Sequence, residues 1–127
     1  MNKKIIFTKN APLPIGPYSQ AVQVGNLVYL SGQIAINSET NELNIADLKT
    51  ETKQVMKNIN ALLNEAGSSF SEIIKTSIFL SNMELFAEVN EIYASYFTEN
   101  FPARETVAVL GLPKNVNVEI SCVALVK

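Results

Sequence analysis

Histidine is absent from this sequence of 127 residues, and cysteine occurs only once, at Cys122. A zinc site needs several His, Cys or carboxylate ligands at recognisable spacing, so zinc-hydrolase and zinc-deaminase chemistry is excluded. Without histidine, neither a Ser-His-Asp triad nor a Cys-His pair can form. A general base must therefore be a carboxylate, a tyrosine, a lysine or bound water, and we expect no metal in the site.

Long apolar runs are also missing. The first ten residues hold too short an apolar stretch for a signal peptide, and no run approaches the length of a membrane span. A single cysteine cannot form an internal disulfide, which is typical of a reducing compartment. We therefore expect a cytoplasmic protein with no membrane partner.

Charge is scarce, since charged residues make up 17% of the chain and the formal net charge is −2. This acidic balance disfavours nucleic acid as a partner. Three lysines recur at helical spacing, Lys49, Lys53 and Lys57, and we interpret them as a solvated helix face. The length predicts a single domain over 1–127, and the low charge leaves room for a surface covered by another subunit.

Apolar periodicity and turn residues predict the element order β-β-β-α-β-α-β-β. The expected strands span 3–8, 20–24, 27–32, 73–81, 104–111 and 116–126, and the first helix is expected over 48–66. Ser81 or Asn82 can cap a second helix, whose apolar face runs from Phe86 to Phe97. Asp47 and Gly67 are suited to cap the first helix, and Pro102 prevents the second from continuing. Both helices connect strands, which favours an α+β fold with two helices on one face of a mixed sheet.

The last predicted strand is apolar on both faces. Six alternate residues from Val116 to Val126 form one apolar face, and Val123 and Leu125 extend apolar character to the other. A sheet with two apolar faces needs two covers. The helices can supply one cover, and we expect a neighbouring subunit to supply the other.

Two charged residues stand out from their surroundings. Arg104 is the only arginine, and a guanidinium is well suited to bidentate binding of a carboxylate. A surface ion pair with a glutamate is the more common role for such a residue. Glu119 interrupts an apolar strand, where it either points outward to solvent or lines a wet cleft and holds a water.

Other residues carry weaker signals. Tyr18 follows a rigid turn, Gly32 lets backbone amides approach a ligand beside Ser31, and Asn90 faces away from an apolar helix stripe. Each also has an ordinary explanation, as a packing tyrosine, a strand end or a surface amide. We interpret Cys122 as a small core residue, because no histidine can activate it.

Several segments resemble the RidA (YjgF-type) family of reactive-intermediate deaminases, and they do so in order along nearly the whole chain. These segments are IGPYSQAV at 15–22, LSGQI at 30–34, FPAR at 101–104, and LPK at 112–114 followed by VEI at 118–120. The resemblance implies a chorismate-mutase-like α+β fold, a homotrimer, and ligand clefts between adjacent subunits.

The resemblance also implies an activity. Members hydrolyse enamine and imine intermediates, such as 2-aminoacrylate and 2-aminocrotonate, to 2-keto acids and ammonia. Pyridoxal-phosphate-dependent dehydratases release these intermediates, and the deaminase needs no cofactor. By the resemblance, Arg104 would bind the substrate carboxylate, Glu119 would activate water or relay a proton, and Tyr18 would line the pocket and position ligand or water.

Supporting contacts would come from Ser31, Gly32, Asn90 and Thr106. Thr106 stands where some members have cysteine, so thiol-dependent behaviour is not expected. Glu105 adjoins the arginine, but strand alternation should point it to the other face.

Two alternative functions stay open. One is non-catalytic binding of small keto or carboxylic acids in the same cleft, and the other is an RNA-directed role, which the acidic composition disfavours.

Overall fold

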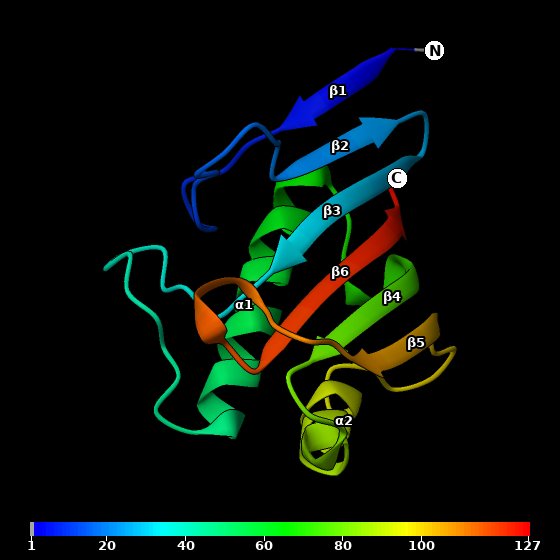
Figure 1. Ribbon diagram of the computed structural model, residues 1–127. Coiled ribbons are helices and arrows are strands. Elements are labelled where there is room, and N and C mark those ends of the chain that lie inside the picture. The colour runs from blue at the N-terminus through cyan, green and yellow to red at the C-terminus, as the bar shows by residue number, and fades with distance from the viewer. Residues whose placement is uncertain (1) are drawn as a thin grey trace.

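Six strands form one mixed sheet in the computed structural model, which describes residues 2–127 (Figure 1). The strand order is β1-β2-β3-β6-β4-β5, and every neighbouring pair is antiparallel except β4 and β5, which are parallel. The strands are β1 (Lys3–Ile6), β2 (Ala21–Val24), β3 (Leu27–Gln33), β4 (Ile73–Leu80), β5 (Ala103–Ala108) and β6 (Val118–Leu125). The predicted element order and the mixed sheet are confirmed.

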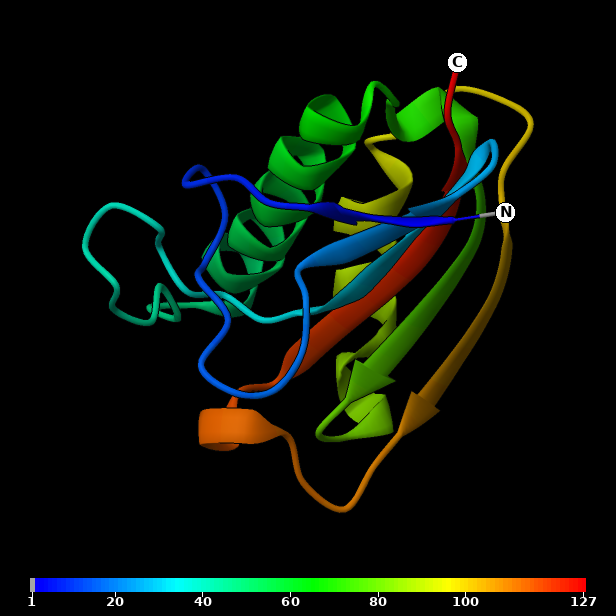
Figure 2. The same cartoon turned by 90° about the horizontal axis from the view of Figure 1, so that it is seen from above.

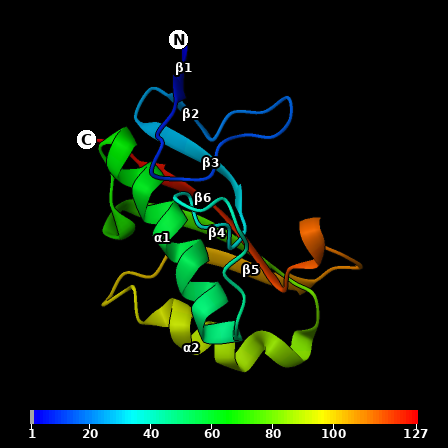
Figure 3. The ribbon, with the colours of Figure 1, turned by 90° about the vertical axis from the view of Figure 1, so that its left-hand side faces the viewer.

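The helices α1 (Leu48–Ala66) and α2 (Phe86–Ala94) both lie on one face of the sheet (Figures 2 and 3). Apolar side chains of α1 such as Val55 and Ile59 pack with Val118 and Ile120 of β6 in one buried core. Cys122 belongs to this core, and burial raises the pKa of its thiol to about 12, as expected of an inert structural cysteine. No helix within residues 2–127 is long and apolar enough to cross a membrane.

The boundaries of the first helix follow its capping residues. The Asp47 side chain accepts a hydrogen bond from the Thr50 N–H at 2.7 Å, and Gly67 ends the helix at φ 78°. The second helix is shorter than predicted. The Asn82 side chain caps a separate 3₁₀ turn at Met83–Leu85, so α2 begins only at Phe86.

The far end of α2 also differs from the prediction. The helix stops at Ala94, three residues before Phe97. The N–H groups of Tyr96 and Phe97 bond to carbonyls three residues earlier, so the chain tightens into 3₁₀-type turns there instead of continuing as α-helix. A periodic pattern of apolar residues does not distinguish these two bond types, which is why the prediction ran too far.

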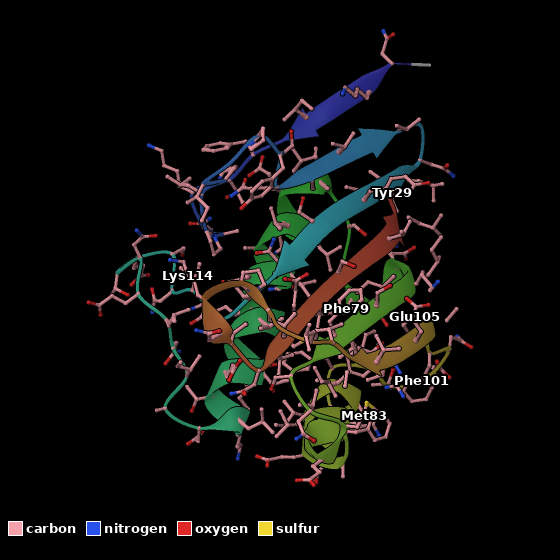
Figure 4. The ribbon with its side chains drawn as sticks, in the orientation of Figure 1. Tyr29, Phe79, Met83, Phe101, Glu105 and Lys114 are labelled. Carbon is pink, nitrogen blue, oxygen red and sulfur yellow. The ribbon has the colours of Figure 1, made fainter. Side chains whose placement is uncertain are left out.

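The second face of the sheet carries no helix. Along β6, side chains alternate between burial under the helices and partial exposure on this open face, as the last-strand pattern predicted. Ile5, Tyr29 and Val107 are exposed apolar residues of the sheet. Figure 4 shows the sheet from this side, with Tyr29, Phe79 and Glu105 labelled. The open face is thus apolar enough to need a further cover.

Candidate active site

Arg104 lies on β5, directly opposite Thr76 of β4, on the helix-covered side of the sheet. Its guanidinium carbon lies 5.3 Å from the ring centre of Tyr93 and 5.6 Å from that of Phe86, both on or at the start of α2. Its Nη1 donates to the Asn90 Oδ1 at 2.6 Å. Aromatic faces and one amide therefore hold the guanidinium by cation–π contact and a single hydrogen bond.

Arg104 forms no ion pair with any group within residues 2–127, where the salt bridges involve lysines. The surface ion pair that the sequence left open is therefore not formed within the described residues of one chain. A cavity of about 440 Å³ opens beside the guanidinium, lined by Asn90, Tyr93, Ala94, Phe101, Pro102 and Arg104. Asn90 and Arg104 are brought together at this cavity, and the guanidinium keeps further donors free for a carboxylate.

Thr106 follows two positions along β5 and shares the helix-covered face with Arg104. Its Oγ1 is buried and has no hydrogen-bond partner among the described residues. A buried hydroxyl without a partner calls for an explanation, and Thr106 is not among the residues that line the cavity beside Arg104. Glu105, between them, points to the open face and contacts Ser77 and Lys75, the latter at 2.9 Å. It does not compete for the guanidinium, so the alternation prediction is confirmed.

Glu119 lies on β6 opposite Phe79, on the open face of the sheet. Its side chain passes directly over Gly32 of β3, and a Cβ at position 32 would lie 2.5 Å from the Glu119 Oε2 and 2.8 Å from its Cδ. Only glycine leaves room for the carboxylate in this position. Burial raises the pKa of the Glu119 carboxyl above its ordinary value.

A second cavity, of about 170 Å³, lies at this carboxylate. Among its lining residues are Glu119, Gly32, Tyr18, Lys114, Ile15 and Ile34. Tyr18 is 51% exposed, and the N–H of Tyr18 bonds to the Gly16 carbonyl in the preceding turn at 2.8 Å. The cavity thus combines a carboxylate and a phenol with aliphatic walls, which suits a small organic ligand.

Ser31 has a different place from its neighbour Gly32. Its hydroxyl donates to the Ser19 carbonyl at 2.6 Å, and its N–H bonds to the Gln20 carbonyl at 2.9 Å. Both of its donors therefore hold the loop that carries Tyr18. Ser31 supports the cavity through this loop.

The two groups of candidate residues lie on opposite faces of the sheet within one chain. Arg104 shares its face with Thr76 and Cys122, its neighbours across the sheet, whereas Glu119 shares the other face with Phe79. In Figure 4, Lys114 of the Glu119 cavity and Phe101 of the Arg104 cavity lie at opposite sides of the molecule. One chain therefore presents two candidate half-sites, each with part of the residues that the sequence singled out, and Arg104 is not among the groups that shift the pKa of Glu119 within one chain.

Buried polar side chains that the sequence analysis passed over hold the walls of the Glu119 cavity. Gln20 accepts from the Thr8 N–H at 2.8 Å and donates to the Pro12 carbonyl at 2.9 Å. Asn58 of α1 donates to the carbonyls of Ile34 and Ile36, both at 3.0 Å. Their signal in the sequence is a polar residue at a position where the apolar pattern predicts burial.

No cluster of three or more His, Cys, Asp or Glu side chains suited to a metal ion occurs within residues 2–127. Arg104 offers hydrogen-bond donors to an anionic group, while Glu119 offers a base. Chemically, the two half-sites could together bind a small carboxylate and move a proton on or off it.

The raised pKa of Glu119 makes a prediction for stability. The folded state favours the protonated Glu119 carboxyl. The contribution of this protonated group to the free energy of unfolding is therefore fully present below the ordinary pKa of 4.5, and it is lost as the pH rises through the raised pKa of the folded state. We expect Glu119→Gln to raise the Tm at about pH 7 and to leave it nearly unchanged at about pH 4. Thermal unfolding across this range checks the result. A lower Tm for the variant at neutral pH would show that the carboxylate stabilises the fold.

Comparison with known proteins identifies the family. The model of the endoribonuclease L-PSP family matches residues 8–126. A RutC family protein of Pyrococcus abyssi is 48% identical over 124 residues, covering 98% of both chains. A protein of Dermatophagoides farinae named 2-iminobutanoate/2-iminopropanoate deaminase is 46% identical over 125 residues, also covering 98% of both chains.

The solved structures agree with the sequence comparison. The crystal structure of YyfA, a conserved Rid-family protein of unknown function from Yersinia pestis, has a TM-score of 0.96 and 49% identity to this chain. The match covers 98% of this chain and 100% of that one. Sequence, fold and site geometry lead to one conclusion: the chain belongs to the endoribonuclease L-PSP family, also known as the YjgF/RidA family.

Proposed function

We propose that this protein hydrolyses 2-imino acids, such as 2-iminobutanoate and 2-iminopropanoate, to the corresponding 2-keto acids and ammonia. The observation that carries the proposal is the guanidinium of Arg104, which is held by aromatic rings and an amide and has no carboxylate partner within residues 2–127. A small carboxylate is the ligand this geometry fits best. The relative from Dermatophagoides farinae bears the name of this activity.

The complete site would form between subunits of a homotrimer. Two features support this. Arg104 and Glu119 lie on opposite faces of the sheet in one chain, and the open face leaves Ile5, Tyr29 and Val107 exposed. Packing the open face of one chain against the β5 edge of the next would cover these apolar residues. It would also bring Arg104 of one chain to the Glu119 cavity of its neighbour.

The chemistry needs only these groups. The substrate carboxylate pairs with Arg104, and the Thr106 hydroxyl supplies a further hydrogen bond on the same side. Glu119 accepts a proton from a water as the water oxygen bonds to the imine carbon and the C=N π electrons move to nitrogen; this proton then passes to the nitrogen, giving a carbinolamine. Glu119 next takes the proton of the new hydroxyl and transfers it to the amino group. The C–N bond breaks with its electrons going to nitrogen, and ammonia leaves as the C=O bond of the keto acid forms. Tyr18 orients the ligand or water, and Asn90 orients the guanidinium.

The source of the substrate follows from its chemistry. Enamines of this type are released when a pyridoxal-phosphate-dependent dehydratase eliminates water from serine or threonine, and they tautomerise to imines. An enzyme of that class would supply the substrate in the cytoplasm. The imine carbon is already electrophilic, so orientation and one acid–base group provide most of the acceleration the reaction needs.

A coupled assay tests the proposal. Threonine dehydratase generates the imine, and the rate of 2-oxobutanoate formation is compared with and without this protein. We expect acceleration by the wild type and a loss of about 10²-fold or more in Arg104→Ala, because the substrate carboxylate loses its main partner. Lys53→Ala removes an exposed positive charge on α1 and serves as the matched control, with unchanged activity expected.

Two outcomes would contradict the proposal. The first is full activity in Arg104→Ala. The second is no acceleration by the wild-type protein, and calorimetry with pyruvate or 2-oxobutanoate would then test the non-catalytic alternative. Saturable binding that depends on Arg104, without turnover, would assign the chain to keto-acid binding.

A further inference from the structure

Glu51 of α1 is a buried carboxylate with an unusual set of partners. Its exposed fraction is 0%, and it accepts three hydrogen bonds from the residues just before Glu119. Its Oε2 accepts from the N–H groups of Asn117 at 2.7 Å and Val118 at 3.1 Å, and its Oε1 accepts from the Asn117 Nδ2 at 2.9 Å. Three donors compensate the charge that burial would otherwise make costly.

Asn117 is also held from its other side, at the end of β4. Its Oδ1 accepts from the Ser81 hydroxyl at 2.9 Å, and its backbone carbonyl accepts from the Ser81 N–H at 3.0 Å. The residue that precedes β6 is therefore fixed both by α1 and by the segment after β4. Glu119 lies only two positions further along the chain.

The sheet itself does not fully fix this end of β6. The regular pairing between β3 and β6 ends at Gln33 and Ile120, where β3 itself ends, and the register already shifts just before this point, between Leu30 and Gln33. Glu119 lies beyond the last paired position, so β3 gives its backbone no regular ladder partner there. Only β4 pairs with Glu119 and Val118, through Phe79 and Leu80. Asn117 and Val118 donate their hydrogen bonds to Glu51 at the end of β6 that β3 no longer pairs with.

We propose that Glu51 is the positioning residue of Glu119: by binding Asn117 and Val118 it fixes the start of β6 and so holds the Glu119 carboxylate over Gly32. The placement of Glu119 is crowded, since no Cβ fits at position 32 beneath it. A small displacement of the strand would move the carboxylate out of the cavity. The effect on turnover rests on the proposed function, whereas the effect on the carboxylate itself does not.

The titration of Glu119 reports its position. Burial raises the pKa of this carboxyl within one chain, and the other titratable side chains lining its cavity are Lys114 and Tyr18. The neighbouring strand β4 contributes Phe79 and the neighbouring strand β3 contributes Gly32, and neither residue titrates. In the proposed trimer the Arg104 guanidinium of the neighbouring chain also faces this cavity. If the strand end shifts, the carboxylate leaves the cavity for water and its pKa moves toward the ordinary value.

The experiment compares Glu51→Leu, Glu51→Gln and the control Leu63→Ala, a buried apolar residue near the other end of α1. Carbon-13 NMR follows the Glu119 carboxyl in the whole protein, with the signal assigned by its loss in Glu119→Gln. For Glu51→Leu we expect a Glu119 pKa closer to the ordinary value than in the wild type and a kcat reduced about tenfold, with a smaller change in KM. Leu63→Ala should lower the Tm and leave both the titration and kcat unchanged.

Glu51→Gln is the conservative rescue. Its amide oxygen can accept the two backbone N–H groups, and the Asn117 amide can rotate to meet the new NH₂ group. We therefore expect a Glu119 titration and a kcat within about twofold of the wild type. If Glu51→Leu does not fold, Asn117→Ala takes its place in the experiment. This variant removes one of the three donors to Glu51, so we expect a change in the Glu119 pKa that is smaller than the one for Glu51→Leu.

The proposal is overturned if folded Glu51→Leu, or Asn117→Ala in its place, keeps the wild-type titration of Glu119. It is equally overturned if Leu63→Ala moves the Glu119 pKa as much, because loss of stability alone would then be the cause. A wild-type protein without turnover would contradict the proposed function instead, and the NMR titration would still decide whether Glu51 positions the carboxylate.

Discussion

Mixing two inactive variants, Arg104→Ala and Glu119→Gln, is expected to restore activity. Each variant alone lacks one of the two groups in every site. In a mixed assembly, a site between two chains can take its arginine from a Glu119→Gln chain and its carboxylate from an Arg104→Ala chain. The recovery follows from the two half-sites on opposite faces of the sheet.

The size of the recovery is set by counting. In a cyclic trimer assembled from equal amounts of the two variants, a given site has both groups intact in about one of four combinations, so activity should reach about a quarter of the wild type. The measurement is the coupled assay on co-expressed or co-refolded protein, with light scattering to establish the mass of the assembly. The control mixes Arg104→Ala with the Arg104→Ala/Glu119→Gln double variant, which leaves no site intact.

The mixing experiment can also fail in an informative way. A monomer by light scattering would contradict the shared site directly. A mixed trimer that stays inactive would show that the two groups do not meet between chains. In either case the binding of a carboxylate by Arg104 would have to be explained by one half-site alone.

Those parts of the fold that depend on local physics could be predicted from the sequence. Asp47 and Gly67 mark the ends of α1 correctly, because capping depends on a few neighbouring residues. The alternation along β6 and the opposite orientations of Arg104 and Glu105 follow from the geometry of a strand. The end of α2 was predicted too far along the chain, because the competing 3₁₀ bonds leave the apolar pattern unchanged.

The candidate site was only partly accessible from the sequence. Arg104 attracts notice as the only arginine, and Glu119 as a charge in an apolar strand. Glu51 looks like an ordinary helix-surface glutamate, because its three partners are 66 or 67 positions away in the chain. The sheet order that places these residues together depends on long-range pairing, which no local pattern encodes.

Gly32→Ala is expected to separate activity from stability. The new methyl group would lie 2.5 Å from the Glu119 Oε2, so the carboxylate must move away. The contact is with the flexible end of a side chain, and we therefore expect the fold to accept it with a small change in Tm. Because Glu119 is then displaced from the substrate's carbon, we expect kcat to fall by about 10²-fold.

Gly111→Ala provides the matched control, because a Cβ at that position would meet nothing within 4 Å. It introduces the same methyl group and the same loss of backbone freedom in the unfolded chain without touching the Glu119 cavity. Unchanged kcat is expected for this variant. If Gly32→Ala also kept its kcat, the exact position of the Glu119 carboxylate would not matter for the chemistry. Glycine at position 32 would then serve only the packing of β3 against β6, and water activation would have to be assigned to another group in the cavity, of which Tyr18 is the first to test.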